Sequence, residues 1–316
     1  MPLNACLPLG ISVLWETAAQ QMALNRQRRR RVEHMSKQTI PHPPRMTKPR
    51  ALMFDLDGTL YRGDDPIPGA DRLISELEAL GVPCWYLTNN STRTPAQVAE
   101  HLHRMGIHAE EARVVTSAAA AAHYAKERFA GRSVYVIGEH GLRHALTESG
   151  FRLAAEGEAD VGLVVQGIDR SLTFDKLTAA VRYLLGGAKY ILTNPDLQLP
   201  VADGILPGAG SISAMLQAAT SKKPILIGKP STILTHYALE KAGVAAEEAW
   251  VIGDNPLTDI AAGEAAGCKS LLVLTGVCTE DDWRERCEAA GAMPAAVLPG
   301  PHELLDYIRS IIQTPN

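Results

Sequence analysis

The sequence predicts an α/β protein whose core is a doubly wound parallel sheet, with a second α/β domain inserted into that core. After Arg50, short apolar runs alternate with amphipathic helical stretches, which is the pattern of strand–helix units around a parallel sheet. The middle of the chain repeats this alternation but carries none of the DLDG, TNNS, GKP and GDN motifs that follow the apolar runs on either side of it. At 316 residues the chain is long enough for two such domains.

Five apolar runs are the expected core strands. Each is short and rich in large apolar side chains, as expected when helices cover both faces of a sheet. Three amphipathic helices are predicted between them, and each ends directly before a glycine, which is a common helix stop signal. The strands are 51–54, 82–87, 225–227, 249–252 and 271–274, and the helices are 70–80, 95–105 and 231–242.

The middle block carries its own alternation. Its predicted strands are 134–137, 161–165 and 190–192, separated by helices at 140–149 and 174–185. We therefore assign residues 131–222 to an inserted domain, and residues 51–130 together with 223–316 to the core.

Composition excludes several classes of function. The net charge of −4 and the pI of about 6.2 provide no broad basic field, so nucleic acid is not an expected partner. The apolar stretch 7–15 is too short to span a bilayer, so no membrane partner is expected either. The five cysteines are odd in number and form no C-x-x-C pair, which argues against a disulfide framework and a zinc site and indicates a reducing, cytoplasmic setting.

The first fifty residues differ from the rest of the chain. Arginines cluster at 26–31, after the apolar stretch rather than before it, which is the wrong order for a secretory signal. We predict a disordered extension over 1–50, or a start codon placed upstream of the true one at Met35 or Met46. An arginine-rich targeting peptide is the alternative.

The first core strand ends in a pair of carboxylates. Asp55 follows the apolar run directly and can act as a nucleophile toward phosphorus, and Asp57 can protonate the leaving oxygen and later activate water. Because two carboxylates and a phosphate cannot share a pocket without a cation, Mg²⁺ is the expected cofactor. A calcium loop is a poor alternative because Gly58 comes too early in the motif.

Two further strand ends carry groups that suit phosphate. Thr88, Asn89 and Asn90 follow the second strand, where a hydroxyl and successive backbone N–H groups can hold phosphate oxygens, although the same residues are good turn formers. Lys229 lies between a glycine and a proline after the third strand and can neutralise the nucleophile and the phosphoryl group.

The fourth strand ends in another pair of acids. Asp254 is the candidate second carboxylate for Mg²⁺, and Asp259 would orient the metal's water or Lys229 from behind the ligands. Because the carboxyl ends of parallel strands meet at one edge of a sheet, all four strand ends are expected to converge there.

These motifs resemble the phosphatases of the haloacid-dehalogenase (HAD) superfamily. The similarity covers roughly residues 50–310 through DLDGTLYRG, LTNNS, IGKP and GDNPLTDI. The most similar subgroup contains NagD-type, p-nitrophenylphosphatase-like, phosphoglycolate and pyridoxal-phosphate phosphatases. The resemblance implies a HAD-like core with an α/β cap domain, hydrolysis of a small phosphorylated metabolite, and a homodimer through the cap as one assembly.

The resemblance also assigns roles to individual residues. It makes Asp55 the nucleophile and Asp57 the general acid and base. It implies that Mg²⁺ is held by the Asp55 side chain, the Asp57 carbonyl and Asp254, and that the phosphate is held by Thr88, Asn89, Asn90 and Lys229.

The loop 193–196 resembles the cap loop that faces the core site in this subgroup. Asn194 and Asp196 are therefore candidate substrate contacts, although both also fit an ordinary Asx turn. Pyridoxal-phosphate members carry a histidine shortly after this loop, and this chain does not, which argues against pyridoxal phosphate as the substrate.

Two other functions use similar residues. A phospho-acceptor receiver module also combines a strand-end aspartate, a threonine, a lysine and Mg²⁺, but Asp57 and the inserted domain argue against it, as do the basic Lys48 and Arg50 where a receiver needs acids. A phosphomutase would share the chemistry at Asp55 and differ only in the acceptor.

Overall fold

The structure is a computed structural model that describes residues 48–201 and 204–313. Most of the predicted N-terminal extension, residues 1–47, lies outside the described residues.

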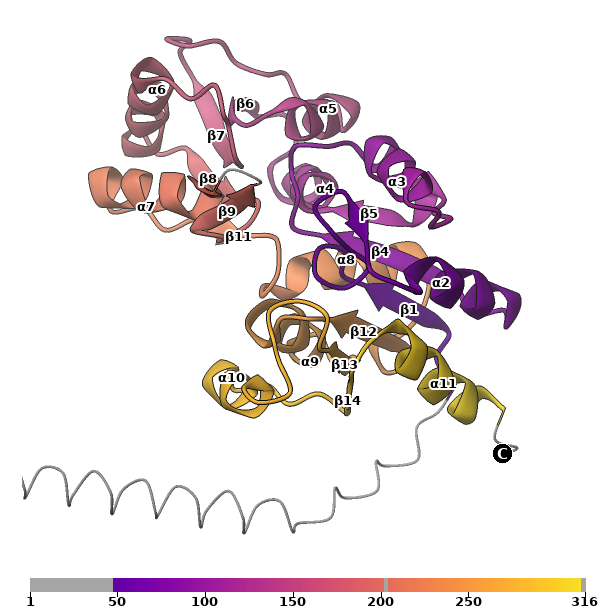
Figure 1. The fold of residues 1–316 in the computed structure, drawn as a ribbon. Coiled ribbons are helices and arrows are strands. Elements are labelled where there is room, and N and C mark those ends of the chain that lie inside the picture. The colour runs from indigo at the N-terminus through magenta and orange to yellow at the C-terminus, as the bar shows by residue number, and fades with distance from the viewer. Residues whose placement is uncertain (1–47, 202–203, 314–316) are drawn as a thin grey trace, which may run out of the picture. The chain divides into compact units, whose positions relative to one another are not determined.

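The main sheet has six parallel strands in the order β14-β13-β12-β1-β4-β5, which confirms the predicted α/β fold with parallel sheets (Figure 1). β4 begins two residues later than predicted, after Pro83, whose nitrogen carries no proton to donate to a ladder. The strands are β1 (Ala51–Phe54), β4 (Cys84–Thr88), β5 (Val114–Thr116), β12 (Ala249–Gly253), β13 (Lys269–Val273) and β14 (Ala296–Leu298).

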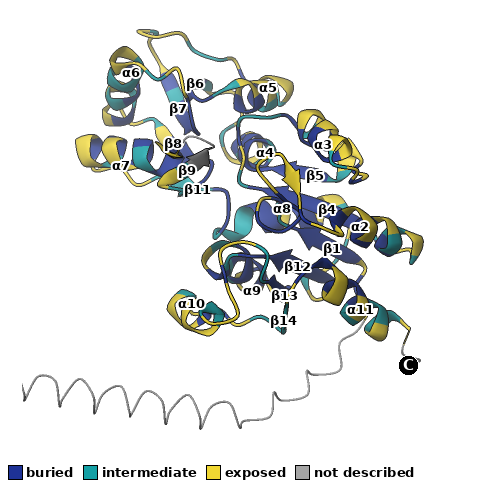
Figure 2. Ribbon diagram, in the orientation of Figure 1, coloured by how far each residue is buried: buried dark blue, intermediate teal, exposed yellow. Residues whose placement is uncertain are grey.

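Helices bury both faces of this sheet. Alternate residues of β1 belong to different apolar clusters, with Ala51 and Met53 in one and Leu52 and Phe54 in the other. Figure 2 shows the sheet as a mostly buried layer, with the edge strand of residues 296–298 only partly covered. The helices α2 (Ala70–Ala79), α3 (Pro95–Arg104) and α11 (Pro301–Ile312) pack on the Phe54 face, and α4 (Ser117–Phe129) and α8 (Thr232–Ala242) pack on the Met53 face.

A second sheet has four parallel strands in the order β11-β8-β7-β6 and forms the cap. Its apolar cluster joins β6, β7 and β8 to two helices, and one core cluster extends into it through Val134 and Leu163. The cap elements are β6 (Ser133–Ile137), α5 (His140–Glu148), β7 (Val161–Gln166), α6 (Phe174–Leu185), β8 (Lys189–Leu192), α7 (Ala209–Thr220) and β11 (Ile225–Leu226).

One strand prediction is wrong. The run at 225–227 was expected in the core sheet, but β11 pairs with β8 of the cap, with Ile225 opposite Ile191. An apolar run indicates that a strand is buried without indicating which sheet it joins, because both sheets have an edge that such a strand can extend. Residues 225 and 226 therefore belong to the cap, and the other domain limits stay predictions.

The remaining elements are short or were not anticipated. Two antiparallel pairs lie outside both sheets, namely β2 (Tyr61–Arg62) with β3 (Asp65–Pro66) and β9 (Gln198–Val201) with β10 (Gly204–Pro207). A π-helical turn, η3 (Pro256–Ile260), follows β12 and leads into α9 (Ala261–Ala265). Two short 3₁₀ turns, η1 (Glu111–Arg113) and η2 (Ala246–Glu248), and the helix α10 (Trp283–Ala290) complete the described part.

Candidate active site

The predicted site lies at the carboxyl edge of the core sheet. Asp55 follows β1 and Asp254 follows β12, and these two strands are neighbours. From β1 the chain continues to β4 on one side, whereas from β12 it continues to β13 on the other. Ligands of open parallel sheets bind where the strand order reverses in this way.

Three carboxylates meet one ammonium group at this edge. Asp55, Asp254 and Asp259 each offer a carboxylate oxygen, and these oxygens all lie within 4.8 Å of one another. Lys229 Nζ lies 2.6 Å from Asp259 Oδ1 and also pairs with Asp55 Oδ1. Asp254, Asp259 and Lys229 are buried. The structure thus brings together four of the predicted residues.

The three carboxylates and one ammonium group of this cluster carry an excess of negative charge when all are ionised. Burial, followed by the Asp259 carboxylate, raises the pKa of Asp55 well above its usual value, although Lys229 opposes the rise. The same two causes raise the pKa of Asp254 to about 7. Burial by itself would lower the pKa of Lys229, but the Asp259 and Asp55 carboxylates hold it above its ordinary value. The cluster would therefore be stabilised by a further cation.

Glycines on two loops cradle the Asp254 carboxylate. A Cβ at Gly58 would lie 2.5 Å from Asp254 Oδ2, and a Cβ at Gly276 would lie 2.0 Å from the same atom. The backbone N–H of Val277 donates to Oδ2 over 2.7 Å. The rotamer of Asp254 is therefore fixed by backbone on both sides, which leaves space only for the carboxylate.

Gly276→Ala is expected to displace the Asp254 carboxylate, because the new methyl group would overlap its oxygen. We expect the Kd of the predicted Mg²⁺ site to rise roughly 10-fold or more, the range for a disturbed metal support. A calorimetric titration with Mg²⁺ measures this shift.

Gly300→Ala is the matched control for Gly276→Ala. Gly300 has an extended backbone, and its added Cβ would meet only Thr275 Cγ2 at 3.5 Å and Glu303 Oε2 at 3.8 Å. An equal Kd for Mg²⁺ in the two variants would show that the Gly276 contact does not position Asp254.

A cavity of about 640 Å³ opens over the cluster. Core residues Asp55, Asp57 and Asp254 line it together with Ile168 and Asp196 from the cap. A small molecule would thus contact both domains at once.

Comparisons with known proteins agree with this geometry. Residues 52–152 match the haloacid dehalogenase-like hydrolase family, and residues 226–303 match a HAD-hydrolase-like family. The chain is 43% identical over 237 residues to the acid sugar phosphatase of Staphylococcus aureus (strain USA300), an alignment that covers 75% of this chain and 91% of that protein. The chain belongs to the haloacid dehalogenase-like hydrolases.

Solved structures place this HAD protein beside the p-nitrophenylphosphatase type. A double mutant of the thermostable NPPase from Geobacillus stearothermophilus has a TM-score of 0.74 and 39% identity, covering 81% of this chain and 98% of that one. The p-nitrophenyl phosphatase from Archaeoglobus fulgidus has a TM-score of 0.78 and 31% identity, covering 82% and 99%. The protein is accordingly a HAD-type phosphatase, which removes the receiver-module alternative.

Asp57 lies at the mouth of the HAD site rather than inside it. Its side chain is exposed, lines the cavity and accepts a long hydrogen bond, of 3.4 Å, from the backbone N–H of Gly63. A solvated carboxylate beside a buried one can exchange protons with both water and a bound molecule.

Asn89 has a structural task that was not predicted. Its side-chain Oδ1 accepts from the backbone N–H of Lys229 over 2.8 Å, and its Nδ2 donates to the Lys229 carbonyl over 3.1 Å. The side-chain amide of Asn89 also bonds the Asp196 carboxylate, so both of its ends are used within the protein and the backbone N–H is the group that it can offer to a phosphate. Its side chain instead fixes Lys229, which no core strand supports.

Thr88 and Asn90 form the turn beside the cavity. Thr88 Oγ1 accepts from the backbone N–H of Asn90 over 3.1 Å, and Asn90 Oδ1 accepts from the backbone N–H groups of Thr92 and Arg93. All four residues line the cavity. These side chains thus stabilise a turn, and that turn lies at the cavity wall.

The two cap candidates differ. Asn194 is buried, donates from Nδ2 to the Asn89 carbonyl over 2.9 Å and accepts from the Asp196 backbone N–H. It therefore links the cap loop to the core loop. Asp196 lines the cavity, and burial raises the pKa of its carboxyl group.

Several residues at the site escaped the sequence prediction. Thr59 Oγ1 lies 3.5 Å from both Asp55 Oδ2 and Asp254 Oδ1, and Arg93 and Arg170 line the cavity. Thr59 belongs to the first motif and could have been found there. The arginines lie in turns, where a sequence gives no sign that they face a ligand.

Among the described residues, no helix has both the length and the apolar character that crossing a membrane requires.

Proposed function

We propose that this protein is a Mg²⁺-dependent phosphatase that hydrolyses a small phosphomonoester through an aspartyl-phosphate intermediate on Asp55. The observation that carries the proposal is the setting of Asp55. Its carboxylate lines the cavity, one oxygen pairs with the buried Lys229, and Asp57 lies two residues away at the cavity mouth.

In the first step, a carboxylate oxygen of Asp55 forms a bond to phosphorus while the bond between phosphorus and the ester oxygen breaks. The carboxyl group of Asp57 gives its proton to the departing alkoxide, which leaves as an alcohol. Lys229 balances the negative charge that gathers around the phosphoryl group.

In the second step, the Asp57 carboxylate takes a proton from water, and the water oxygen bonds to phosphorus. The bond between phosphorus and Asp55 breaks, which restores the Asp55 carboxylate and releases inorganic phosphate. The exposure of Asp57 supports this role because the residue must reach both the leaving alcohol and water.

The donor set fits a hard divalent cation. Oxygens of Asp55 and Asp254 lie close together, and Gly58 and Gly276 hold Asp254 in place. Among the residues that the structure describes, one ammonium group, that of Lys229, faces the three carboxylates. We propose that Asp55, Asp254 and the Asp57 carbonyl hold Mg²⁺, with Asp259 behind them. When bound, the ion supplies neutralisation of the phosphate charge.

Sugar phosphates and related small phosphomonoesters are the proposed substrates. The cavity of about 640 Å³ suits a molecule of this size, and the relative from Staphylococcus aureus is named an acid sugar phosphatase. A phosphomutase would share the first step, and analysis of the products separates the two, because only hydrolysis releases inorganic phosphate.

Hydrolysis of p-nitrophenyl phosphate tests the function. We expect the wild-type protein to release nitrophenol with Mg²⁺, to stop when EDTA is added, and to recover when Mg²⁺ is supplied in excess. Folded, Mg²⁺-loaded protein that hydrolyses neither this ester nor any of a panel of metabolite esters would contradict the proposal.

Mg²⁺ is also expected to stabilise the fold. A ligand present at about 100 times its Kd stabilises the native state by about 2.7 kcal/mol, which should raise Tm on the order of 5 °C. Thermal melts in EDTA and in Mg²⁺ measure the shift. Asp254→Asn should shrink it, whereas an equal shift in that variant would place the ion elsewhere.

The homodimer through the cap stays a prediction. Leu197, directly before β9, and Ile205, in β10, are the kind of exposed apolar side chains that a second copy would cover, with exposed fractions of 62% and 64%.

A further inference from the structure

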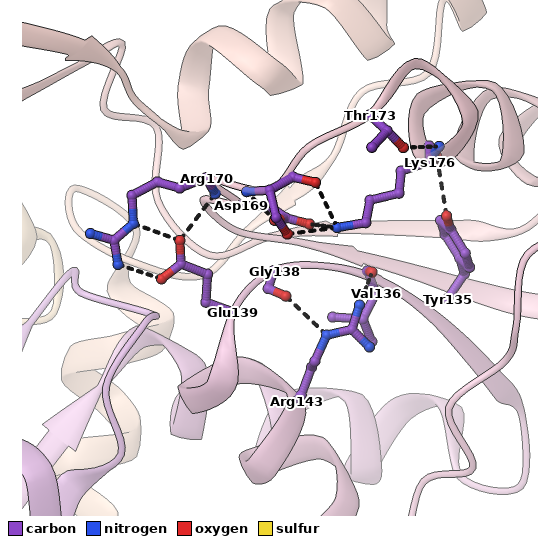
Figure 3. Close-up of polar contacts among 10 residues, drawn as sticks. Tyr135, Val136, Gly138, Glu139, Arg143, Asp169, Arg170, Thr173 and Lys176 are labelled. Carbon is purple, nitrogen blue, oxygen red and sulfur yellow. Dashed lines mark hydrogen bonds and ion pairs between the residues drawn. The ribbon is translucent and has the colours of Figure 1, made fainter.

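A rigid turn on the cap carries a cationic residue into the cavity wall. The turn joins β7 to α6, and its buried Asp169 accepts from Ser171 Oγ over 2.7 Å and from Lys176 Nζ over 2.8 Å (Figure 3). Lys176 also donates to the Ser171 carbonyl over 3.0 Å. Arg170 lies between these residues, so its backbone is fixed.

The side chain of Arg170 is fixed as well. Glu139, in the loop before α5, accepts from Arg170 Nε over 2.7 Å and from Nη2 over 2.6 Å, and its Oε1 also accepts from the Arg170 backbone N–H (Figure 3). A guanidinium group has five N–H donors, and the bonds to Glu139 use one edge of it. In the described part of the chain no acceptor bonds the other edge, which is therefore open, and the Arg170 side chain is 62% exposed and lines the cavity.

A second arginine reaches the same cavity from the core. Arg93 is half-buried and lines the cavity, and its backbone N–H donates to Asn90 Oδ1 over 3.1 Å. A Cβ at Gly141 would lie 2.5 Å from the Arg93 carbonyl oxygen, so cap helix α5 packs tightly against this residue. Within residues 48–201 and 204–313, Arg93 forms no ion pair. A half-buried cation without a partner favours an anionic ligand.

The charges of the cavity divide into two groups. Asp55, Asp57 and Asp254 belong to the phosphoryl end, and Asp196 interacts with Lys229 at that end. Arg62 donates from Nε to the Thr275 carbonyl over 2.9 Å, next to Gly276 and Asp254, so its charge also lies at the phosphoryl end. Away from that end, the two remaining arginines face Glu139, which leaves a surplus of one positive charge.

We propose that Arg93 and Arg170 are specificity-determining residues that bind a carboxylate on the leaving group. The preferred substrates are then phosphomonoesters of small hydroxy acids, including sugar acids. One carboxylate balances the surplus charge, and the open edge of the locked Arg170 suits its two oxygens. Glu139 is a positioning residue that presents this edge. The inference rests on the proposed phosphatase function.

Two matched substrate pairs test the proposal with Mg²⁺-loaded full-length protein. 3-Phosphoglycerate and glycerol 3-phosphate differ by a carboxylate in place of a hydroxymethyl group, as do 6-phosphogluconate and sorbitol 6-phosphate. The measured quantity is the ratio of kcat/KM for the acid to kcat/KM for its neutral partner. We expect wild-type protein to favour the acid in at least one pair.

Arg93→Gln and Arg170→Gln are each expected to lower this ratio roughly 10- to 100-fold, the range for a lost charge-assisted hydrogen bond. Arg93→Lys should keep part of the preference for the acid, because lysine retains the positive charge but lacks the paired N–H donors of a guanidinium group. Glu139→Gln should raise KM for the acid more than it lowers kcat, because it frees Arg170 without removing its charge. Arg182→Gln, on the exposed side of α6, is the control and should keep the wild-type ratio.

The outcomes separate the two proposals. Wild-type protein that hydrolyses p-nitrophenyl phosphate but treats both members of each pair alike would overturn the carboxylate assignment alone. An equal loss for acid and neutral substrates in Arg93→Gln would also overturn it and assign Arg93 to the transferred phosphoryl group. No hydrolysis of any ester would overturn the phosphatase function and this inference with it.

Discussion

Asp55→Asn is expected to reduce turnover of p-nitrophenyl phosphate by roughly 10⁴-fold or more, the scale seen when a covalent nucleophile is removed. Asparagine has nearly the same shape as aspartate, so Lys229, Asp254 and Asp259 keep their surroundings. Its amide cannot form an acyl phosphate, and the covalent route is closed. Steady-state kinetics measure the loss, and near-ultraviolet circular dichroism checks the fold.

The same variant should lose the covalent intermediate. Acid-quenched wild-type protein is expected to carry one phosphate on the peptide that contains Asp55, and Asp55→Asn should carry none. A folded Asp55→Asn protein with turnover within tenfold of wild type would show that another group attacks phosphorus.

Asp57→Asn is the matched comparison, since it makes the same chemical change two residues away. Nitrophenol is a good leaving group that needs little help from an acid, so the first step should survive better than the second. We therefore expect a burst of nitrophenol followed by slow turnover, with phosphate accumulating on Asp55.

The strand-end motifs made the location of this site predictable. Asp55 and Asp254 are 199 positions apart in sequence, yet each follows a short apolar run. In a parallel sheet such runs end at one edge, so a local pattern was enough to predict a long-range meeting. The structure places the two carboxylates together for this reason.

Lys229 shows where local patterns stop being sufficient. Its proximity to Asp55 was predicted from a core strand at 225–227, but β11 joins the cap sheet. The residue is held instead by Asn89, which lies 140 positions earlier in the sequence and whose side-chain amide bonds both the backbone N–H and the carbonyl of Lys229. Such a contact depends on two loops meeting, and neither loop sequence specifies its partner. The pairing of Arg170 with Glu139 was invisible for the same reason.

Lys229→Met is expected to have the second large effect, on both stability and activity. The change leaves Asp55, Asp254 and Asp259 buried together without the ammonium group that now faces them. Removing one partner of a buried ion pair costs about 3–5 kcal/mol, because the remaining charge is uncompensated. Turnover should fall by roughly 100-fold or more, as when a stabilising group at a transition state is lost.

Lys126→Met is a matched control, because Lys126 lies on the exposed side of α4. It removes a lysine of the same size without touching the cluster. Urea unfolding of both variants in EDTA measures the difference in stability. Equal stability of the two variants would mean that Lys229 does not offset the buried carboxylates.

The pH dependence of Lys229→Met follows from the carboxyl groups that remain. Burial already raises the pKa of Asp254 to about 7 and that of Asp55 well above its usual value, and removing the ammonium group takes away a force that lowers both. A carboxyl group with a raised pKa binds more protons in the folded state than in the unfolded state, so stability falls as pH rises toward the folded pKa. The loss of stability relative to wild type should therefore be smaller at about pH 5 than at about pH 8.

Mg²⁺ should reduce the difference in stability between Lys229→Met and wild type at the higher pH, since a divalent cation offsets the same ionised carboxylates. A loss that is equal at both pH values and unaffected by Mg²⁺ would instead trace the effect of Lys229 to packing alone.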